Sequence, residues 1–208
     1  MKGLLLKDFY MLTKYCRWYL LVALIFILVF AVGKDSLFFG FYPCLLTGMI
    51  PVTLMAYDER SKWDMYCKGL PYTGAEIVSA KYLVGLCCQL FVMILTGIAL
   101  AVRMNMAGKF DLEEYLYFLL LSETVSCAAS SLMLPFLFKF GVEKGRIAYY
   151  CMIGIVLSGA AVAANLLRSG GSRVEMHTWI APVICIAAIA VYALSWCLSV
   201  SFYKKREG

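Results

Sequence analysis

Ionised side chains are scarce in this chain. Only 15% of its 208 residues are charged and 63% are hydrophobic, whereas a soluble globular domain carries about 25% charged residues. The mean hydropathy is +0.82. This composition excludes an ordinary soluble domain and predicts a membrane protein.

Catalytic and metal-binding signatures are missing as well. The single histidine, His177, excludes motifs that need two, such as H-E-x-x-H. The pairs Gly33-Lys34 and Gly108-Lys109 lack the flanking Gly and the following Ser or Thr of a phosphate-binding P-loop. The nine cysteines show no CxxC spacing with histidine, and they are expected to pack as small apolar side chains without disulfides. We therefore expect no catalytic residue, metal or cofactor on this chain.

Long apolar runs occupy most of the chain instead. A helix needs about 20 apolar residues to cross a bilayer core of roughly 30 Å, and continuous runs of about that length recur, without the alternation of a β-barrel. The predicted fold class is all-α: a polytopic membrane protein with six transmembrane helices, forming one domain over residues 1–208. The predicted spans are 18–32, 37–57, 82–102, 115–138, 147–167 and 179–202. A signal peptide is the alternative for the first run, but its 17-residue basic lead is long for one.

The basic residues are distributed unevenly between the two sides of this layout. Of the 19 lysines and arginines, 14 fall on the side that holds both termini. Short cytoplasmic loops carry an excess of Lys and Arg, so both termini are predicted to be cytoplasmic. The net charge of +6 then reflects contact with anionic lipid head groups, and no nucleic-acid partner is expected.

Residues 1–17 precede the first span and have a helical pattern with two sides. The basic side holds Lys7, Tyr10, Lys14 and Arg17, and the apolar side holds Leu5, Phe9, Leu12 and Cys16. This pattern predicts an interfacial helix that lies along the inner leaflet. Asp8 interrupts the apolar side. The alternative is a cytosolic extension of the first span.

One carboxylate lies deep within an apolar run. Glu123 is about ten residues into the fourth predicted span, where a charge costs roughly 3 kcal/mol. It is therefore a candidate functional residue. The alternative is a structural hydrogen bond to Ser122, Ser126 or a neighbouring helix. Small residues four apart, such as Ser126 and Ser130, predict close helix packing.

The longest polar stretch is the second connector, residues 58–81, within YDERSKWDMYCKGLPYTGAEIVSAKYL. Gly69 and Pro71 divide it into two pieces. The first piece places Trp63, Tyr66, Cys67 and Leu70 on one face of a short helix. In the second piece Thr73 and Glu76 have the spacing of a capping box. A loop of about four to six residues would join two spans, so the extra length favours a docking platform for a cytoplasmic partner. The alternative is that Trp63 and Tyr66 rest in the lipid head groups.

This layout resembles the permease subunits of ABC type-2 exporters, in particular the short bacterial ones encoded apart from their ATPase. The similarity is most specific in the connector. The matching residues there are Asp58, Glu59, Arg60, Lys62, Trp63, Leu70, Pro71, Thr73 and Lys81. Gly74 departs from the pattern, because the family commonly has a basic residue after the hydroxyl position.

The resemblance implies a half-transporter in the bacterial plasma membrane. Two copies of this permease would work among membrane lipids with two copies of a separate ATPase subunit, and ATP and Mg²⁺ would bind to that ATPase. The connector would couple the two chains. The implied coupling residues are Asp58, Glu59, Arg60, Trp63, Leu70, Pro71 and Thr73. Because the outer connectors are short, we expect a small amphipathic cargo such as a peptide, toxin or drug.

Two other functions are compatible with the residues. An ATP-independent secondary transporter could use Glu123 as a proton site, although no internal repeat typical of such carriers relates the first three spans to the last three. A membrane partner of a signalling kinase, without transport, is the other. Whether a neighbouring gene encodes a P-loop ATPase distinguishes these alternatives.

Overall fold

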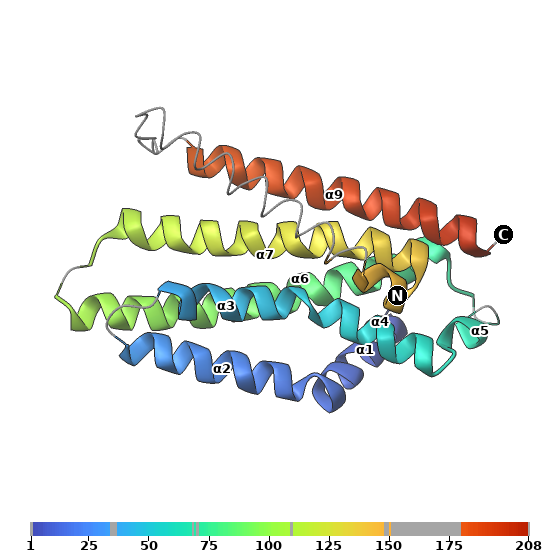
Figure 1. Cartoon of the computed structure of the whole chain (residues 1–208), viewed down its shortest axis with the longest axis horizontal. Helices are drawn as coiled ribbons and strands as arrows, with labels where there is room; N and C mark the ends of the chain where they lie inside the picture. The colour runs from blue at the N-terminus through green and yellow to red at the C-terminus, as the bar shows by residue number, and fades with distance from the viewer. Residues whose placement is uncertain are drawn as a thin grey trace.

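The computed structural model describes residues 2–33, 37–67, 69, 71–108, 110–147, 150 and 180–207. All regular elements within these ranges are helices, which confirms the predicted all-α fold class. They include α1 (Lys2–Tyr15), α2 (Arg17–Val32), α3 (Leu37–Gly48), α4 (Ile50–Arg60), α5 (Trp63–Cys67), α6 (Gly74–Met106), α7 (Leu112–Phe140) and α9 (Ile180–Glu207). The long helices run side by side along one axis (Figure 1).

Four helical segments are long and apolar enough to cross a membrane: Phe39–Arg60, Gly74–Met106, Leu112–Phe140 and Ile186–Lys205. The pair α1 and α2 passes the same test together, as one bent span. These segments match five of the predicted spans, and α6 and α7 extend beyond the predicted ends. The fifth predicted span, 147–167, falls almost entirely outside the described residues, so the total of six stays a prediction.

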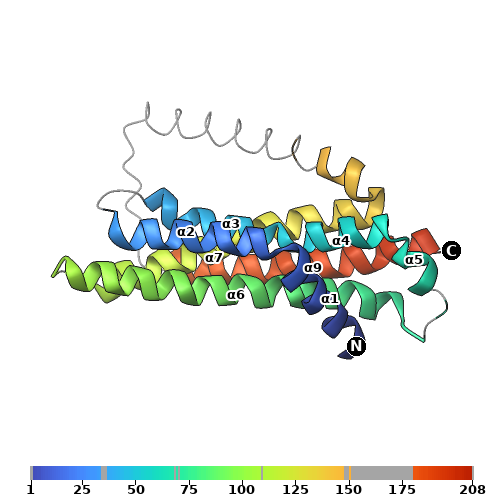
Figure 2. The same ribbon diagram turned by 90° about the horizontal axis from the view of Figure 1, so that it is seen from below.

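The chain bends by 66° between α1 and α2, so α1 is not a straight extension of the first span. Figure 2 shows α1 leaving the bundle axis and crossing α6. Its buried side holds Leu4, Asp8 and Leu12. Phe9, predicted to be on the apolar side, is 44% exposed. The buried face is shifted because Asp8 turns inward, for the reason given below.

Segment Phe39–Arg60 consists of α3 and α4, which meet at Met49. Pro51 lies in the first turn of α4, where a missing backbone N–H costs nothing. It packs against Gly85 of α6, where a Cβ would come within 2.6 Å of the proline ring. Glycine therefore permits α4 and α6 to approach closely, and this approach brings the end of α4 beside the start of α6.

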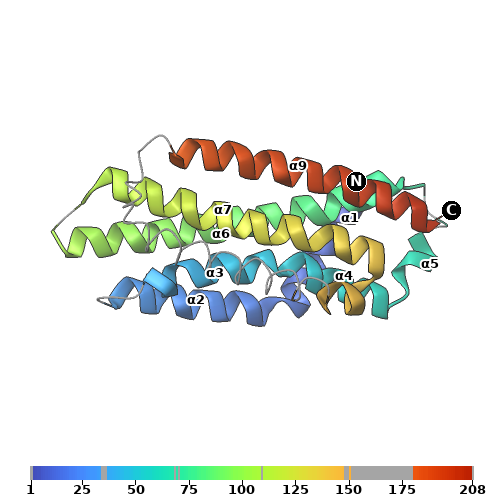
Figure 3. The same cartoon turned by 45° about the horizontal axis from the view of Figure 1, so that its top comes forward.

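Both chain termini and α5 lie toward the same end of the bundle, which we name the connector end (Figures 1 and 3). The apolar core of this end includes Val78, Tyr82, Leu134, Leu137 and Phe138. It joins α6 and α7 to α9 through Tyr203. Both termini share one end, as the predicted topology requires.

Candidate functional site

Four charged side chains meet at the connector end, where α1, α4 and α6 come together. Lys7 and Asp8 come from α1, Asp58 from the last turn of α4, and Lys81 from α6. Lys7 Nζ lies 2.7 Å from Asp58 and 3.4 Å from Asp8. Lys81 Nζ lies 2.7 Å from Asp8 and 2.5 Å from Asp58. Each lysine thus contacts both aspartates. We call these four residues the ion-pair cluster.

The ion-pair cluster is electrically neutral, and three of its members are buried, whereas the Lys7 side chain is 21% exposed. Asp8 is 1% exposed and Lys81 is 4% exposed. Charges taken out of water need partners, because the penalty of removing their hydration is otherwise several kcal/mol per ion. Here two positive and two negative groups satisfy one another. The cluster therefore fixes the position of α1 against α4 and α6, and none of its buried carboxylates is available to an outside partner.

This arrangement explains why Asp8 interrupts the apolar side of the N-terminal helix: its carboxylate faces the ammonium of Lys81, 73 positions along the chain. Sequence reasoning did not find the cluster, although it singled out Asp8, Asp58 and Lys81 separately. An acid on the buried side of one helix and a lysine early in another were the available signals. What the sequence lacked was the helix crossing that brings them together.

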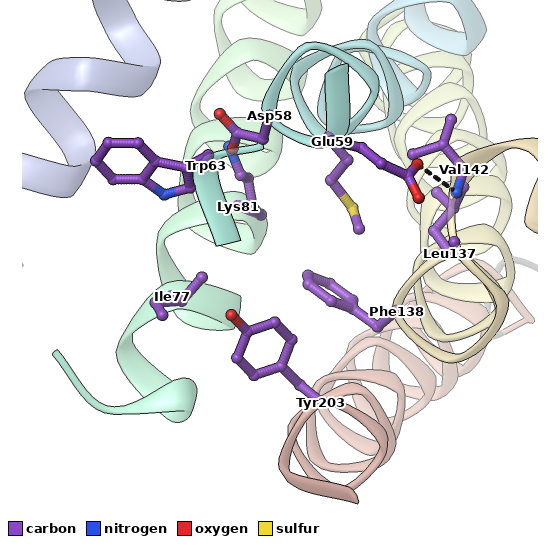
Figure 4. Close-up of a pocket in the computed structure, with 11 residues that line it drawn as sticks. Asp58, Glu59, Trp63, Ile77, Lys81, Leu137, Phe138, Val142 and Tyr203 are labelled. Atoms are coloured by element: carbon purple, nitrogen blue, oxygen red, sulfur yellow. Dashed lines mark hydrogen bonds and ion pairs between the residues drawn. The ribbon is translucent and has the colours of Figure 1, made fainter. Parts of the chain in front are cut away.

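Trp63 packs against other residues of the same chain. The ammonium of Lys7 lies 4.1 Å from the centre of its indole ring, a cation–π contact. The half-buried ring also packs against the apolar core of the connector end, as does the buried Cys67. Figure 4 shows Trp63 at the edge of a pocket that Ile77, Phe138 and Tyr203 also line. α5 is therefore held to the bundle through Trp63.

Glu59 connects α4 to the segment that follows α7. Its Oε2 accepts a hydrogen bond of 2.9 Å from the backbone N–H of Val142 (Figure 4). Gly141, which ends α7, has φ +80°, and a Cβ there would meet the Glu59 carboxylate at 2.9 Å. Only glycine adopts this backbone without strain and leaves room for the carboxylate.

The predicted break in the connector is confirmed. Thr73 Oγ1 accepts a 3.4 Å hydrogen bond from the N–H of Glu76, and Glu76 Oε2 accepts one of 3.0 Å from the N–H of Thr73. This capping box begins α6. Pro71, two residues before Thr73, is exposed, as is Arg60 at the end of α4, and Leu70 lies outside the described residues.

The outer surface of α5 differs from the predicted face. Met65 is 71% exposed and Tyr66 is 70% exposed, whereas Trp63 and Cys67 turn inward. In a helix Tyr66 and Cys67 point about 100° apart, so burial of Cys67 turns Tyr66 outward. Met65 and Tyr66 are thus exposed on the outer side of α5, while Trp63 and Cys67 hold its inner side against the bundle.

Polar groups also meet midway along α6 and α7. Gln89 Nε2 donates to the carbonyl of Ser126 at 3.3 Å and to Ser130 Oγ at 3.2 Å. The thiol of Cys127 lies 3.6 Å from Glu123 Oε1. The hydrogen-bond partner of Glu123 Oε1 is thus the thiol of Cys127 in the same helix. The structural alternative had named Ser122, Ser126 or a neighbouring helix. Within the described part of the chain, the buried Oε2 of Glu123 has no hydrogen-bond partner.

Comparison with known proteins agrees with the layout of the helices. Residues 3–204 match the family model described as ABC-2 family transporter protein. No curated protein and no solved structure matches the chain. Because the match extends over nearly the whole chain, this protein belongs to the ABC-2 transporter family and is a membrane permease component.

Proposed function

We propose that this protein is the permease half of an ATP-driven exporter, in which two copies assemble with two copies of a separate ATPase. ATP and Mg²⁺ bind to the ATPase, and this chain carries no catalytic residue. The observation that carries the proposal is the connector: α5 exposes Met65 and Tyr66 while its inner side is fastened to the bundle.

The exposed tip of α5 suits a hydrophobic groove on a partner. Met adapts its shape to such surfaces, and Tyr supplies apolar area with a polar tip. Arg60 and Pro71 are exposed in the same connector, one before α5 and one after it. We assign Arg60 a charge contact at the rim and Leu70 an apolar contact, with Pro71 keeping the two connector pieces at a fixed angle.

Two sets of contacts would transmit a displacement of α5 to the membrane helices. Lys7 contacts Trp63 and belongs to the ion-pair cluster, so a displacement of α5 reaches α1, α4 and α6. Glu59 links the end of α4 to Val142 after α7, and Thr73 fixes the start of α6. Close-packed contacts and ion pairs transmit displacement because they resist deformation. Asp58, Glu59, Trp63 and Thr73 thus act by positioning the platform.

Orientation and cargo follow from charge and connector length. The 14 basic residues on the side of both termini support cytoplasmic termini in a bacterial plasma membrane. The connector end then faces the cytoplasmic ATPase. Short outer connectors favour a small amphipathic cargo, such as a peptide, toxin or drug.

Replacement of Met65 and Tyr66 by Ala tests the docking surface. Truncation of central anchors commonly costs about 2 kcal/mol, so the affinity for the ATPase should fall about 30-fold. The measurement is co-purification with the P-loop ATPase that this proposal requires, sought first among the neighbouring genes, with ATP hydrolysis and export followed on complexes in lipid nanodiscs. Phe110→Ala with Leu112→Ala is the matched control, because these side chains are also more than half exposed, at the opposite end. Unchanged binding by the Met65/Tyr66 variant would contradict the docking role.

The carboxylate of Glu123 supports the second candidate function, a proton-coupled secondary transporter, because its buried Oε2 lacks a hydrogen-bond partner among the described residues. A proton site would make transport depend on a pH gradient. Export from vesicles that contain the complex should stop without ATP if the first proposal holds. Transport driven by a pH gradient alone, and abolished by Glu123→Gln, would favour the second.

A further inference from the structure

A groove runs between α2 and α6, starting at the bend that joins α1 to α2. Its polar lining side chains, Thr13 and Arg17, lie at the bend. The rest of its lining is apolar and comes from the two helices: Leu20, Leu21, Ala23, Leu24, Ile27, Phe91, Val92 and Leu95. The groove is therefore amphipathic along its length, with one cationic end and a long apolar part.

The length of the apolar part matches one leaflet of a bilayer. Arg17 and Ile27 are ten residues apart on one helical stretch, which gives about 15 Å at a rise of about 1.5 Å per residue. This is half of the roughly 30 Å hydrocarbon core. A chain that starts at the membrane surface and ends at the midplane would fill the groove.

One cationic side chain, Arg17, lines the groove at the bend, and a second, Lys14, lies three residues before it on the other side of the bend. Lys14 and Arg17 are both exposed, one on each side of the bend. A guanidinium binds a phosphate through two parallel N–H donors, and a nearby ammonium adds a point charge. Trp18, 65% exposed, lies beside Arg17, whose Cζ is 5.6 Å from its ring centre. Exposed Trp and Arg at a helix end are typical of the lipid head-group level.

We propose that this groove binds an anionic glycerophospholipid, with one acyl chain between α2 and α6 and the phosphate held by Arg17 and Lys14. The apolar lining excludes water, because water there would lack hydrogen-bond partners. An unfilled groove would lose the dispersion contacts of its lining. An acyl chain satisfies both conditions, and the anionic head group complements the two cations.

A second copy of the chain is the competing occupant. In a parallel two-fold dimer the same patch of each copy faces its partner. Lys14 and Arg17 of both copies would then gather at one level, and like charges in contact repel. A lipid phosphate meets the same cations with opposite charge. Charge complementarity therefore favours the lipid.

Native mass spectrometry of the full-length protein in detergent micelles tests the proposal. The probes are phosphatidylglycerol and phosphatidylcholine with identical acyl chains. The wild-type protein should bind phosphatidylglycerol more tightly than phosphatidylcholine, and Lys14→Gln with Arg17→Gln should weaken phosphatidylglycerol binding about 30-fold. Lys204→Gln with Lys205→Gln is the matched control, because these two basic residues are exposed at the same end of the bundle.

A second pair of variants tests the apolar part without changing charge. Leu21→Trp fills the groove and should weaken binding of both lipids, whereas Leu28→Trp places the same bulk elsewhere on α2 and should leave binding unchanged. Equal effects of each test variant and its control would show only general lipid contact and overturn the proposal. Disulfide-linked dimers formed by Leu21→Cys, in a chain without its nine native cysteines, would assign the groove to a second copy instead.

Discussion

The ion-pair cluster and the polar residues around Gln89 both bury polar groups between helices, yet their chemistry differs. The ion-pair cluster uses full charges at the connector end, where α1, α4 and α6 meet. The group around Gln89 uses an amide, hydroxyls and a thiol halfway along α6 and α7. The ion-pair cluster joins three helices that are not consecutive in the chain, whereas the group around Gln89 joins the consecutive helices α6 and α7.

The difference follows from depth in the membrane. Near the head groups, water and lipid phosphates lie within reach, so charged side chains cost less than at the midplane. Neutral hydrogen-bonding groups carry a smaller penalty at any depth. Charges therefore join the helices at the connector end, and neutral groups join them halfway along. Glu123 departs from this division, which is why it remains the strongest intramembrane candidate for a functional role.

Removal of one charge from the ion-pair cluster should produce the largest effect. Lys81→Met leaves two buried aspartates with one lysine, and breaking a buried pair in this way costs about 3–5 kcal/mol. The free energy of unfolding, measured by denaturant titration in bicelles, should fall by this amount. Lys62→Met is the matched control, because Lys62 is exposed in the same connector and should change stability little.

The neutral double variant Lys81→Met with Asp8→Asn separates charge from packing. It restores the balance of one lysine and one aspartate. We expect it to recover part of the stability that Lys81→Met loses, since an uncompensated buried charge is the main cost. If the double variant is as unstable as the sum of both single changes, charge balance is not what holds this end together.

Replacement of Gln89 by Leu should have a smaller effect. It removes the two hydrogen bonds that Gln89 donates and the long one that its Oε1 accepts from the Cys127 thiol. Ser130 Oγ keeps its bonds to the carbonyls of Ser126 and Cys127. Hydrogen bonds between membrane helices contribute about 1 kcal/mol. The unfolding free energy should fall by about this amount in the same assay. A loss as large as that of Lys81→Met would break the comparison between charged and neutral regions.

The helices could be predicted from the sequence, because a bilayer requires long apolar runs, and these are visible without a structure. Apolar runs placed α2, α6, α7 and α9 within a few residues of their observed ends, apart from the early start of α6. The capping box at Thr73 was also predictable, since it depends on residues only three apart. A pattern of this kind involves only residues close in sequence, so it does not depend on how the helices pack.

The roles of individual connector residues were not predictable in the same way. Trp63 and Tyr66 have similar sequence signals, yet one packs beneath Lys7 and the other is exposed. Which of them turns inward depends on how α1 crosses the bundle, and that crossing is set by contacts between residues more than 50 positions apart. Periodicity alone carries no information about such contacts.

The smallest expected effect is that of Thr73→Ala, which sharpens the comparison within the connector end itself. Thr73 is exposed, so loss of its hydroxyl leaves the N–H of Glu76 to water and costs about 1 kcal/mol. Thr73 caps the helix that carries Lys81, but the loss of stability from Thr73→Ala should be far below that from Lys81→Met, because Thr73 is exposed and Lys81 is buried. Thr73→Ser should keep the cap and the stability. Thr13→Ala is the internal control: that hydroxyl bonds the carbonyl of Tyr10 within α1 and caps no helix start, so its removal should be nearly silent. If Thr73→Ala matched Lys81→Met in the unfolding assay, proximity to the connector end, and not burial of charge, would decide how much a residue stabilises this protein.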